Sequence, residues 1–335
     1  MSQVLALKYR PSRFSEVIGQ AFTINQIKSA VIKKTLGHSL LFSGTRGCGK
    51  TTTARIVAMV LNCQKPKDGE PCGKCDSCKC ALEGRHDEII ELDAASNNGV
   101  DDVRSLQETI RYTTRGHRVV ILDEVHMLSK PAFNALLKLL EEPPKGLTLI
   151  LATTEPNKLL PTVVSRCQRY DFKDVDTSTL VDYYTSICTK EGMDLSAAKQ
   201  AAVIANGSVR DGLSYLQKFL AGEAVEDDSK EYFDLVAAVY QKDTVSALDT
   251  LAKLTAKNEA RIITQTLQKW FYWCSLENFG IKTPVRELFE GGQNLQFDLK
   301  HLQELFRITL DIERDLYATP NSKIVLEMGM IRLCI

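Results

Sequence analysis

One octapeptide near the N-terminus has the spacing of a phosphate-binding loop. Residues 44–51 read GTRGCGKT and fit G-x-x-x-x-G-K-[ST] without a mismatch. The glycines allow backbone N–H groups to wrap phosphate oxygens, Lys50 would reach the β- and γ-phosphates, and the Thr51 hydroxyl would ligate Mg²⁺. A helix beginning near Thr51 would direct its positive end at the same phosphates. The motif therefore predicts binding of a nucleoside triphosphate with Mg²⁺. The predicted nucleotide contacts are Gly44, Thr45, Arg46, Gly47, Cys48, Gly49, Lys50, Thr51 and Thr52.

An acidic pair, Asp123 and Glu124, directly follows the apolar run at 118–122. Carboxylates at the carboxyl end of a buried strand lie at the mouth of an α/β crevice, where ligands bind. Asp123 is then placed to ligate Mg²⁺, and Glu124 can polarise a water for in-line attack on the γ-phosphate. Beside an intact phosphate loop, this pair predicts hydrolysis of the triphosphate, in which catalysis is mostly positioning and charge stabilisation.

A cysteine cluster follows the loop. Its members, in the pattern C-x₈-C-x₂-C-x₂-C, are Cys63, Cys72, Cys75 and Cys78. Two-residue gaps let neighbouring thiolates converge on one tetrahedral ion, and four ligands close the site, which favours structural zinc. Cys80 is a fifth thiol that can displace one of the four, and His86 is a weaker competitor. The remaining cysteines are widely spread and are expected to be small buried hydrophobes.

The phosphate loop, the acidic pair and the cysteine cluster lie between short apolar runs and segments with helical periodicity. These strands and helices must position them. Continuous runs of β-branched residues and leucine indicate strands covered on both faces, as in a parallel sheet. Alternation of strand and helix over 1–172 predicts an α/β domain, with a zinc-binding insert at about 63–80. The expected strands are 39–43, 88–92, 118–122, 147–152 and 168–172, and the expected helices are 51–62, 99–115 and 130–142.

Beyond about residue 172 only helical patterns remain. Segment 176–221 reads as short helices broken at Gly192 and Gly207, and the acidic stretch 223–230 is a candidate linker. From 232 to 335 the pattern predicts a helical bundle, interrupted at Gly291-Gly292 and at Pro320.

Composition narrows the function class and the compartment. The 335 residues include 42 Lys plus Arg and 42 Asp plus Glu, which argues against a broadly basic protein that coats DNA. A local basic track is still compatible with this balance. The sequence has no apolar run of the roughly 18 residues that a membrane span needs. Residues 1–10 lack the apolar core of a signal peptide, so we expect a cytoplasmic location.

With longer segments included, residues 1–220 resemble the gamma/tau subunits of bacterial DNA polymerase III. These are the AAA+ ATPases of the sliding-clamp loader. From 232 onward the resemblance rests mainly on helical character. Besides GTRGCGKTT and the cysteine insert, the matching segments are LALKYRPSRFSEVIGQ, ELDAASNNGVDDVR, ILDEVHMLSKPAFNALLKLLEEPP, LATTEPNKLLPTVVSRCQRYDF and GSVRDGLSYL.

The resemblance implies roles for further residues. Arg166, in the segment SRC, matches an arginine that reaches across a subunit interface to the neighbour's γ-phosphate, where it stabilises transition-state charge. Thr154 matches a residue that senses the γ-phosphate, with Thr153 as its one-residue rival. Arg210 matches a second sensor on the helical lid. The segment that frames the adenine is matched by Tyr9, Arg10, Pro11, Val17 and Ile18. Candidate contacts with the DNA backbone are Asn97, Asn98, Arg104 and Arg111.

The resemblance also implies a division of the chain and a function. It implies an AAA+ domain over 1–172, a helical lid over 173–237 and a helical oligomerisation collar over 238–335. ATP would stabilise a pentamer-like spiral of clamp-loader subunits that opens the ring-shaped clamp around primed DNA, and hydrolysis would release the clamp for DNA polymerase III. The family is catalogued with DNA-directed DNA polymerases, but this chain is not expected to polymerise DNA itself. Longer members bind polymerase and helicase through a tail that lies beyond this sequence.

Three other functions stay open at this point. One is an AAA+ branch-migration motor, against which the SRC segment and the cysteine insert argue. Another is a non-hydrolysing structural subunit of the clamp loader, a type that usually has a degraded phosphate loop, whereas Lys50, Thr51, Asp123 and Glu124 are all present here. The third is a zinc-dependent interaction module with a vestigial nucleotide site.

Overall fold

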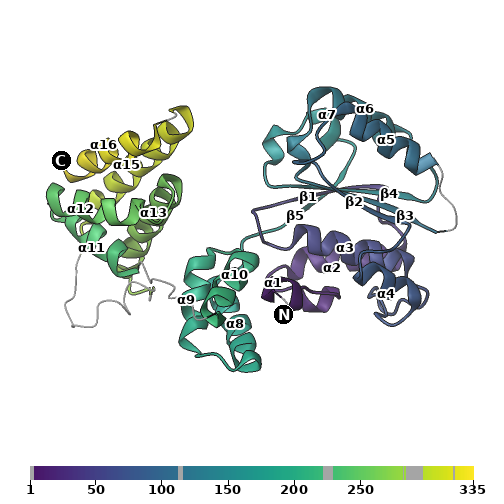
Figure 1. The fold of residues 1–335 in the computed structure, drawn as a ribbon, viewed down its shortest axis with the longest axis horizontal. Coiled ribbons are helices and arrows are strands. Elements are labelled where there is room, and N and C mark those ends of the chain that lie inside the picture. Colours follow the sequence, from purple (N-terminus) through teal and green to yellow (C-terminus); the bar gives the residue numbers. More distant parts are fainter. Residues whose placement is uncertain (1–3, 112–115, 222–228, 282, 284–296, 320) are drawn as a thin grey trace. The chain divides into compact units, whose positions relative to one another are not determined.

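The computed structural model describes residues 4–111, 116–221, 229–281, 283, 297–319 and 321–335. The chain divides into two compact units, 1–225 and 226–335. The first holds a sheet with helices on both faces and the helices of 177–220, for which the predicted name lid is kept below, and the second is built from helices (Figure 1).

The sheet has five parallel strands in the order β2-β3-β4-β1-β5. The strands are β1 (Ser39–Ser43), β2 (Ile89–Asp93), β3 (Arg118–Asp123), β4 (Leu147–Thr153) and β5 (Gln168–Asp171). All five predicted strands are confirmed, with ends shifted by at most one residue. Every residue of β1 and β4 is buried, because helices cover both faces and leave no solvent-facing side for polar residues.

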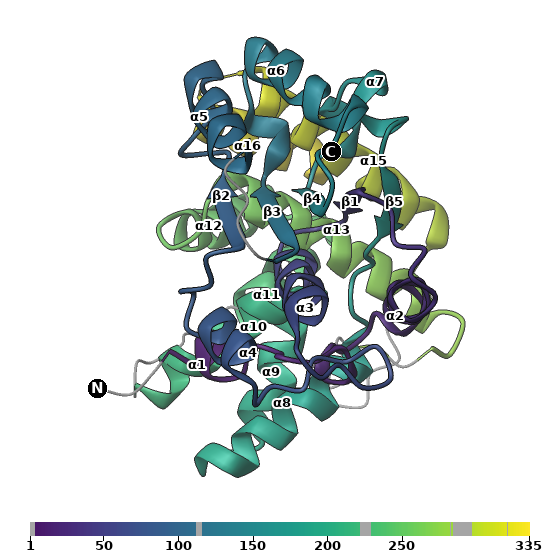
Figure 2. The same ribbon diagram turned by 90° about the vertical axis from the view of Figure 1, so that its right-hand side faces the viewer.

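Side chains of successive strand residues alternate between the two faces. Leu40 and Phe42 of β1 pack in the cluster of α2 (Ala21–Lys33) and α3 (Lys50–Asn62). Leu41 packs in the cluster of α5 (Val100–Arg111) and α6 (Lys130–Glu141) on the opposite face. Figure 2 shows the two helical layers on either side of the strands. The shorter elements of this part are α1 (Leu5–Lys8), η1 (Phe14–Glu16), α4 (Asp76–Leu82), η2 (Val125–Met127), η3 (Pro156–Lys158) and α7 (Pro161–Val164).

The lid consists of α8 (Thr177–Glu191), α9 (Ser196–Ala205) and α10 (Val209–Leu220). Asp176 and Ser208 begin α8 and α10 by accepting hydrogen bonds from backbone N–H groups of the first turn. Leu5 of α1 is buried in the lid's apolar cluster, and its N–H donates to Gln217 Oε1 at 2.7 Å. Residues 4–18, called the N-terminal arm below, were predicted to belong to the sheet domain. They pack on the lid through Leu5 and on the sheet domain through Phe14.

The second unit contains α11 (Ser229–Tyr240), α12 (Thr244–Thr255), α13 (Ala260–Glu277), α15 (Leu299–Ala318) and α16 (Ser322–Cys334) around one apolar core. The lid was expected to extend to residue 237, but Leu235 and Val236 of α11 are buried in the core of this second unit. The division at 225 therefore lies earlier than the predicted boundary. The candidate linker at 223–230 falls largely outside the described residues, as do the predicted interruptions at Gly291-Gly292 and Pro320.

Helices long and apolar enough to cross a membrane do not occur within the described ranges.

Candidate functional site

The phosphate-binding loop connects β1 to α3 through left-handed backbone conformations. Gly49, the residue before α3, has φ +107°, and Gly47 has φ +75°. A Cβ added to Gly47 would lie 2.0 Å from the Ser208 Oγ of the lid. Glycine is therefore required at 47 twice over, by the backbone angle and by the close approach of α10.

Lys50 and Thr51 begin α3, and their side chains lie in different directions. Lys50 is buried, and its Nζ donates to the carbonyl oxygens of Gly44 at 2.8 Å and Thr45 at 2.7 Å. Thr51 Oγ1 donates to Asp123 Oδ2 at 2.7 Å. A hydroxyl and a carboxylate in contact are oxygen ligands of the kind that Mg²⁺ prefers, so this pair fits the predicted magnesium site.

Glu124 follows β3 in a left-handed conformation, with φ 46°. Its Oε2 accepts a hydrogen bond at 3.0 Å from the Oγ1 of Thr154, the residue that follows β4. Thr153 is fully buried instead, and its hydroxyl lies 3.0 Å from His126 Nδ1 and accepts from the N–H of Glu155 at 3.0 Å. The structure thus places Thr154, and not its rival Thr153, against the acidic pair.

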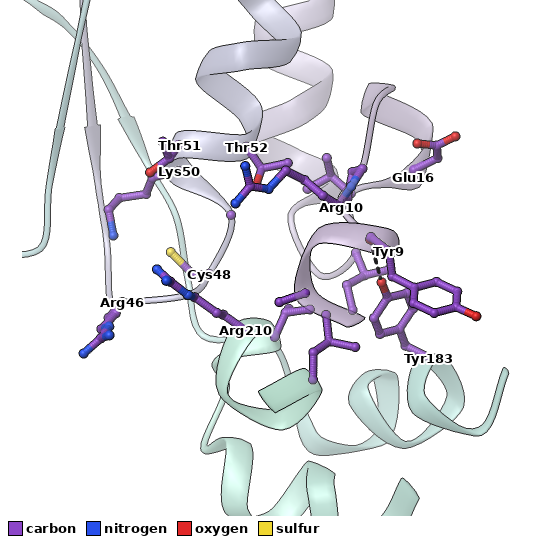
Figure 3. A pocket seen from close by; sticks show the side chains of 18 of the residues that line it. Tyr9, Arg10, Glu16, Arg46, Cys48, Lys50, Thr51, Thr52, Tyr183 and Arg210 are labelled. Carbon is purple, nitrogen blue, oxygen red and sulfur yellow. Dashed lines mark hydrogen bonds between the residues drawn. The ribbon is translucent and has the colours of Figure 1, made fainter. Parts of the chain in front are cut away.

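One pocket gathers most of the predicted nucleotide contacts. It is lined by the loop from Arg46 to Thr52, by the acidic pair, and by Arg210. The predicted adenine-framing residues Tyr9, Arg10, Pro11, Val17 and Ile18 all line it too. In Figure 3, Arg210 reaches from the lid toward the loop, whereas Tyr9 and Tyr183 lie at the other end of the pocket. No motif in the sequence pointed to the further lining residues, which are Ala6, Glu16, Tyr183, Val209 and Leu213.

The arm that carries Tyr9 is anchored on α8. The Tyr9 hydroxyl donates to Glu191, which also pairs with Lys8 at 2.6 Å, and the Tyr183 hydroxyl donates to the Tyr9 carbonyl at 3.2 Å. Burial, followed by the hydrogen bond to Glu191, raises the pKa of Tyr9 to about 12. These contacts tie the wall of the pocket that Tyr9 forms to α8.

Arg166 follows α7 and does not line this pocket. Its guanidinium donates to the Thr162 carbonyl at 2.8 Å and pairs with Glu141 Oε1 at 2.9 Å. The Arg166 side chain is 37% exposed. The structure therefore leaves Arg166 at the surface of its own domain, apart from its own phosphate loop.

The four predicted zinc ligands converge. The sulfur atoms of Cys63, Cys72, Cys75 and Cys78 lie within 4.8 Å of one another, and Cys80 is outside this group. Four thiolates around one zinc ion at about 2.3 Å lie about 3.8 Å apart, so the cluster fits a closed tetrahedral site. Backbone N–H groups of Lys74 and Cys75 lower the pKa of Cys72 to about 6, whereas burial raises the pKa of Cys63 and of Cys78.

His86 is occupied elsewhere, since its Nε2 lies 2.9 Å from Ser77 Oγ. The Cys48 thiol in the phosphate loop is buried, which raises its pKa. Cys48 Sγ donates to the Thr45 carbonyl at 2.9 Å, so this thiol forms a hydrogen bond within the phosphate loop.

The candidate DNA contacts lie at the start of α5 and along it. Asn97 donates through its side chain to the Asp93 carbonyl at 3.0 Å, and the carbonyl of Asn98 accepts from the N–H of Ser129 at 3.1 Å. Arg104 is exposed and pairs with Asp101 at 3.1 Å. The side chain of Arg111 lies outside the described residues.

Comparison with known proteins matches residues 19–176 to the family model "DNA polymerase III, delta subunit". The chain is 34% identical to the DNA polymerase III subunit tau of Bacillus subtilis, over 99% of this chain and 63% of that protein. It is 44% identical to the DNA polymerase III subunit gamma/tau of Mycobacterium tuberculosis, over 65% of this chain and 39% of that protein.

A solved structure of a DNA polymerase III gamma subunit-related protein from Thermotoga maritima is also similar. It has a TM-score of 0.48 and 17% identity, over 92% of this chain and 97% of that one. The parallel sheet with its helices, followed by helical regions, confirms the predicted α/β fold class.

One relative is matched over nearly its whole length. The DNA polymerase III subunit gamma of Buchnera aphidicola is 31% identical over 99% of this chain and 98% of that protein. The chain therefore belongs to the gamma/tau subunit family of bacterial DNA polymerase III.

Proposed function

We propose that this chain is the ATP-hydrolysing subunit of a bacterial clamp loader. In this role it uses ATP to load a ring-shaped sliding clamp onto primed DNA for DNA polymerase III. The observation that carries the proposal is the single pocket in which the phosphate loop, the acidic pair, the N-terminal arm and Arg210 of the lid meet. A nucleotide in this pocket would contact both Arg210 of the lid and the N-terminal arm. Its phosphates could therefore set the position of the lid, as a nucleotide-dependent switch requires.

Within this pocket each residue has one task. Lys50 turns its ammonium group from the loop carbonyls toward the β- and γ-phosphates, and the N–H groups of 44–51 hold phosphate oxygens. Thr51 and Asp123 would hold Mg²⁺, which would supply positive charge beside the phosphates. Glu124 orients the attacking water, and Thr154, hydrogen-bonded to it, reports the γ-phosphate.

Arg166 acts on the adjoining subunit. It lies at the surface and apart from its own loop, as expected for an arginine supplied in trans. The catalytic site is therefore completed by assembly with other clamp-loader subunits. We assign the helices of the second unit to the oligomerisation collar, and the cysteine cluster to structural zinc.

The test is reconstitution. The chain is mixed with its cognate clamp-loader subunits, and the ATPase rate is measured with and without clamp and primed DNA. Stimulation by both is expected. A rate that does not respond to clamp and primed DNA contradicts the clamp-loader assignment, whether the cause is a non-hydrolysing subunit or a branch-migration motor. Lys50→Ala addresses the zinc-module alternative, because unchanged clamp loading by this variant would leave the nucleotide site without a function.

A further inference from the structure

A tight turn in the cysteine insert presents one carboxylate to the N-terminal arm. The turn spans residues 67–70, between the cluster residues Cys63 and Cys72. The N–H of Lys67 donates to the Glu70 carbonyl at 3.1 Å, and the N–H of Glu70 to the Lys67 carbonyl at 2.9 Å. Asp68 and Gly69 at its centre both have positive φ, 53° and 75°. This is the geometry that an Asp-Gly pair favours in a two-residue hairpin, so the direction of Glu70 is fixed by the turn.

The Glu70 carboxylate holds the start of the short helix η1. Its Oε2 accepts from the N–H of Phe14 at 2.8 Å, and its Oε1 accepts from the N–H of Ser15 at 3.1 Å. Lys28 Nζ donates to Oε1 at 2.9 Å. The first N–H groups of a helix have no partner within it and carry partial positive charge. The largely covered Glu70 carboxylate, 14% exposed, accepts from the N–H groups of Phe14 and Ser15 and places negative charge beside them.

A second bond joins the same two segments. The Arg13 guanidinium donates to the carbonyl oxygen of Cys72 at 3.1 Å. Cys72 is itself one of the four clustered thiols. The cysteine insert therefore contacts residues 13–15 through the Glu70 carboxylate and through the Cys72 carbonyl. Cys72 is also one of the predicted metal ligands.

Helix η1 leads directly to a wall of the nucleotide pocket. Phe14 is buried in the core beneath α2 and α3, and the N–H of Val17 donates to its carbonyl at 3.1 Å. Val17 and the next residue, Ile18, line the pocket. The resemblance to the gamma/tau family assigns these two residues to the base, and Val17 also borders the phosphate loop, since a Cβ added to Gly49 would lie 3.8 Å from its Cγ1. The Glu70 contacts that hold η1 in place therefore also position Val17 and Ile18.

We propose that Glu70 is a positioning residue for the nucleotide base, and that bound zinc supports base binding through it. A metal ion at the four cysteines would fix the conformation of the insert, and with it the positions of Glu70 and the Cys72 carbonyl. These two groups bind residues 13–15, which lead to the part of the arm that frames the base. The proposal rests on the proposed function of the pocket as an ATP site. It extends that function by giving the cysteine insert a task in nucleotide recognition.

The experiment compares ATP with inorganic tripolyphosphate, which offers phosphates but no base. The full chain is titrated with a fluorescent ATP analogue, and each unlabelled ligand is used to displace it. Zinc content is measured on the same samples. The variants are Glu70→Ala, Glu70→Gln and, as a matched control, Glu83→Ala, which removes an exposed glutamate of the same region that pairs with Arg85.

Glu70→Ala is expected to weaken ATP binding about three- to tenfold, the worth of one ordinary hydrogen bond, with zinc retained. Tripolyphosphate affinity is expected to change less than about twofold, because the phosphate loop is untouched. Glu70→Gln recovers part of the loss, since its amide oxygen still accepts one N–H. Glu83→Ala behaves as wild type. Chelation of zinc weakens ATP binding in wild type and adds little in Glu70→Ala, because both changes release the same arm.

Two results overturn the proposal. One is a zinc-loaded Glu70→Ala chain that binds ATP as tightly as wild type. The other is an equal loss for ATP and tripolyphosphate, which would mean general destabilisation of the fold. If Glu70→Ala does not fold, the same comparison is made with Glu70→Gln. A wild-type chain that binds neither ligand contradicts the proposed nucleotide site itself, which is a separate failure.

Discussion

The hydroxyl of Thr154 donates a hydrogen bond to Glu124 Oε2 at 3.0 Å, linking the ends of β4 and β3. In the proposed mechanism Glu124 orients the attacking water. A γ-phosphate that draws the Thr154 hydroxyl toward itself would free this carboxylate for the water. In that mechanism the same contact would restrain Glu124 before nucleotide binds.

The two threonines at the end of β4 are expected to behave differently when each is changed to valine. Thr154→Val should lower the ATPase rate of the assembled complex by roughly tenfold, with little change in stability, because its hydroxyl acts on Glu124. Thr153→Val should instead lower the free energy of unfolding by about 1–3 kcal/mol, because it removes a fully buried hydroxyl that contacts His126 Nδ1 and accepts from the N–H of Glu155. Steady-state kinetics and denaturant unfolding separate the two. A Thr153→Val chain that is stable but inactive would reverse the assignment.

The acidic pair should also separate into two roles. Glu124→Gln is expected to bind ATP with Mg²⁺ normally and to hydrolyse it about 10²–10⁴-fold more slowly, since only the water-orienting carboxylate is lost. Asp123→Asn is expected to lose the dependence of ATP binding on Mg²⁺, because its carboxylate contacts Thr51 at 2.7 Å. Nucleotide titrations with and without Mg²⁺, followed by single-turnover hydrolysis, measure both. Identical behaviour of the two variants would contradict this division.

Arg166 is expected to matter only to a neighbour. Arg166→Ala should leave ATP binding intact and reduce hydrolysis at the adjoining site by about 10³–10⁵-fold in the assembled complex. The control is Glu141→Gln, which removes the partner of Arg166. The pair is half-exposed and such pairs contribute little stability, so this variant should hydrolyse ATP at the wild-type rate or faster. Normal hydrolysis by Arg166→Ala in the assembled complex would exclude the trans role.

Much of the site could be predicted because its signals are local in sequence. Lys50 and Thr51 lie within one octapeptide, and Asp123 follows a continuous apolar run that only a buried strand explains. The choice between Thr153 and Thr154 could not be made from sequence, because adjacent strand residues point to opposite faces and a one-residue shift exchanges them.

The contacts that sequence reasoning missed are long-range. The Glu70 contact with Phe14 and the Glu191 contact with Tyr9 join residues 56 and 182 positions apart, and no spacing rule relates them. The boundary between the two units was placed too late for a similar reason. An amphipathic helix such as α11 shows that it has an apolar face, but its sequence does not say which core that face joins.

Gly47 provides a test of how closely the lid and the phosphate loop are fitted. Gly47→Ala places a Cβ on a backbone with φ +75°, 2.0 Å from Ser208 Oγ and 3.2 Å from the Cβ of Arg210. Gly84→Ala is the matched control, because Gly84 has φ +69° and nothing within 4 Å of the added Cβ. Each variant should lose about 1–2 kcal/mol of stability from the left-handed backbone. Only Gly47→Ala must also either turn the Ser208 hydroxyl away from the Asp211 N–H that it accepts from, or shift the start of α10 and with it Arg210.

Nucleotide binding should therefore distinguish the two alanine variants. Gly47→Ala is expected to weaken ATP binding by about tenfold or more beyond any effect of Gly84→Ala, since misplacing one charge-assisted contact costs about 1.5–3 kcal/mol. The double variant Gly47→Ala with Ser208→Ala should recover part of the affinity, because it removes the hydroxyl that the new methyl meets. Equal ATP affinities for Gly47→Ala and Gly84→Ala would show that the lid adjusts freely to the loop. In that case Arg210 would not be held in register with the phosphates by this contact.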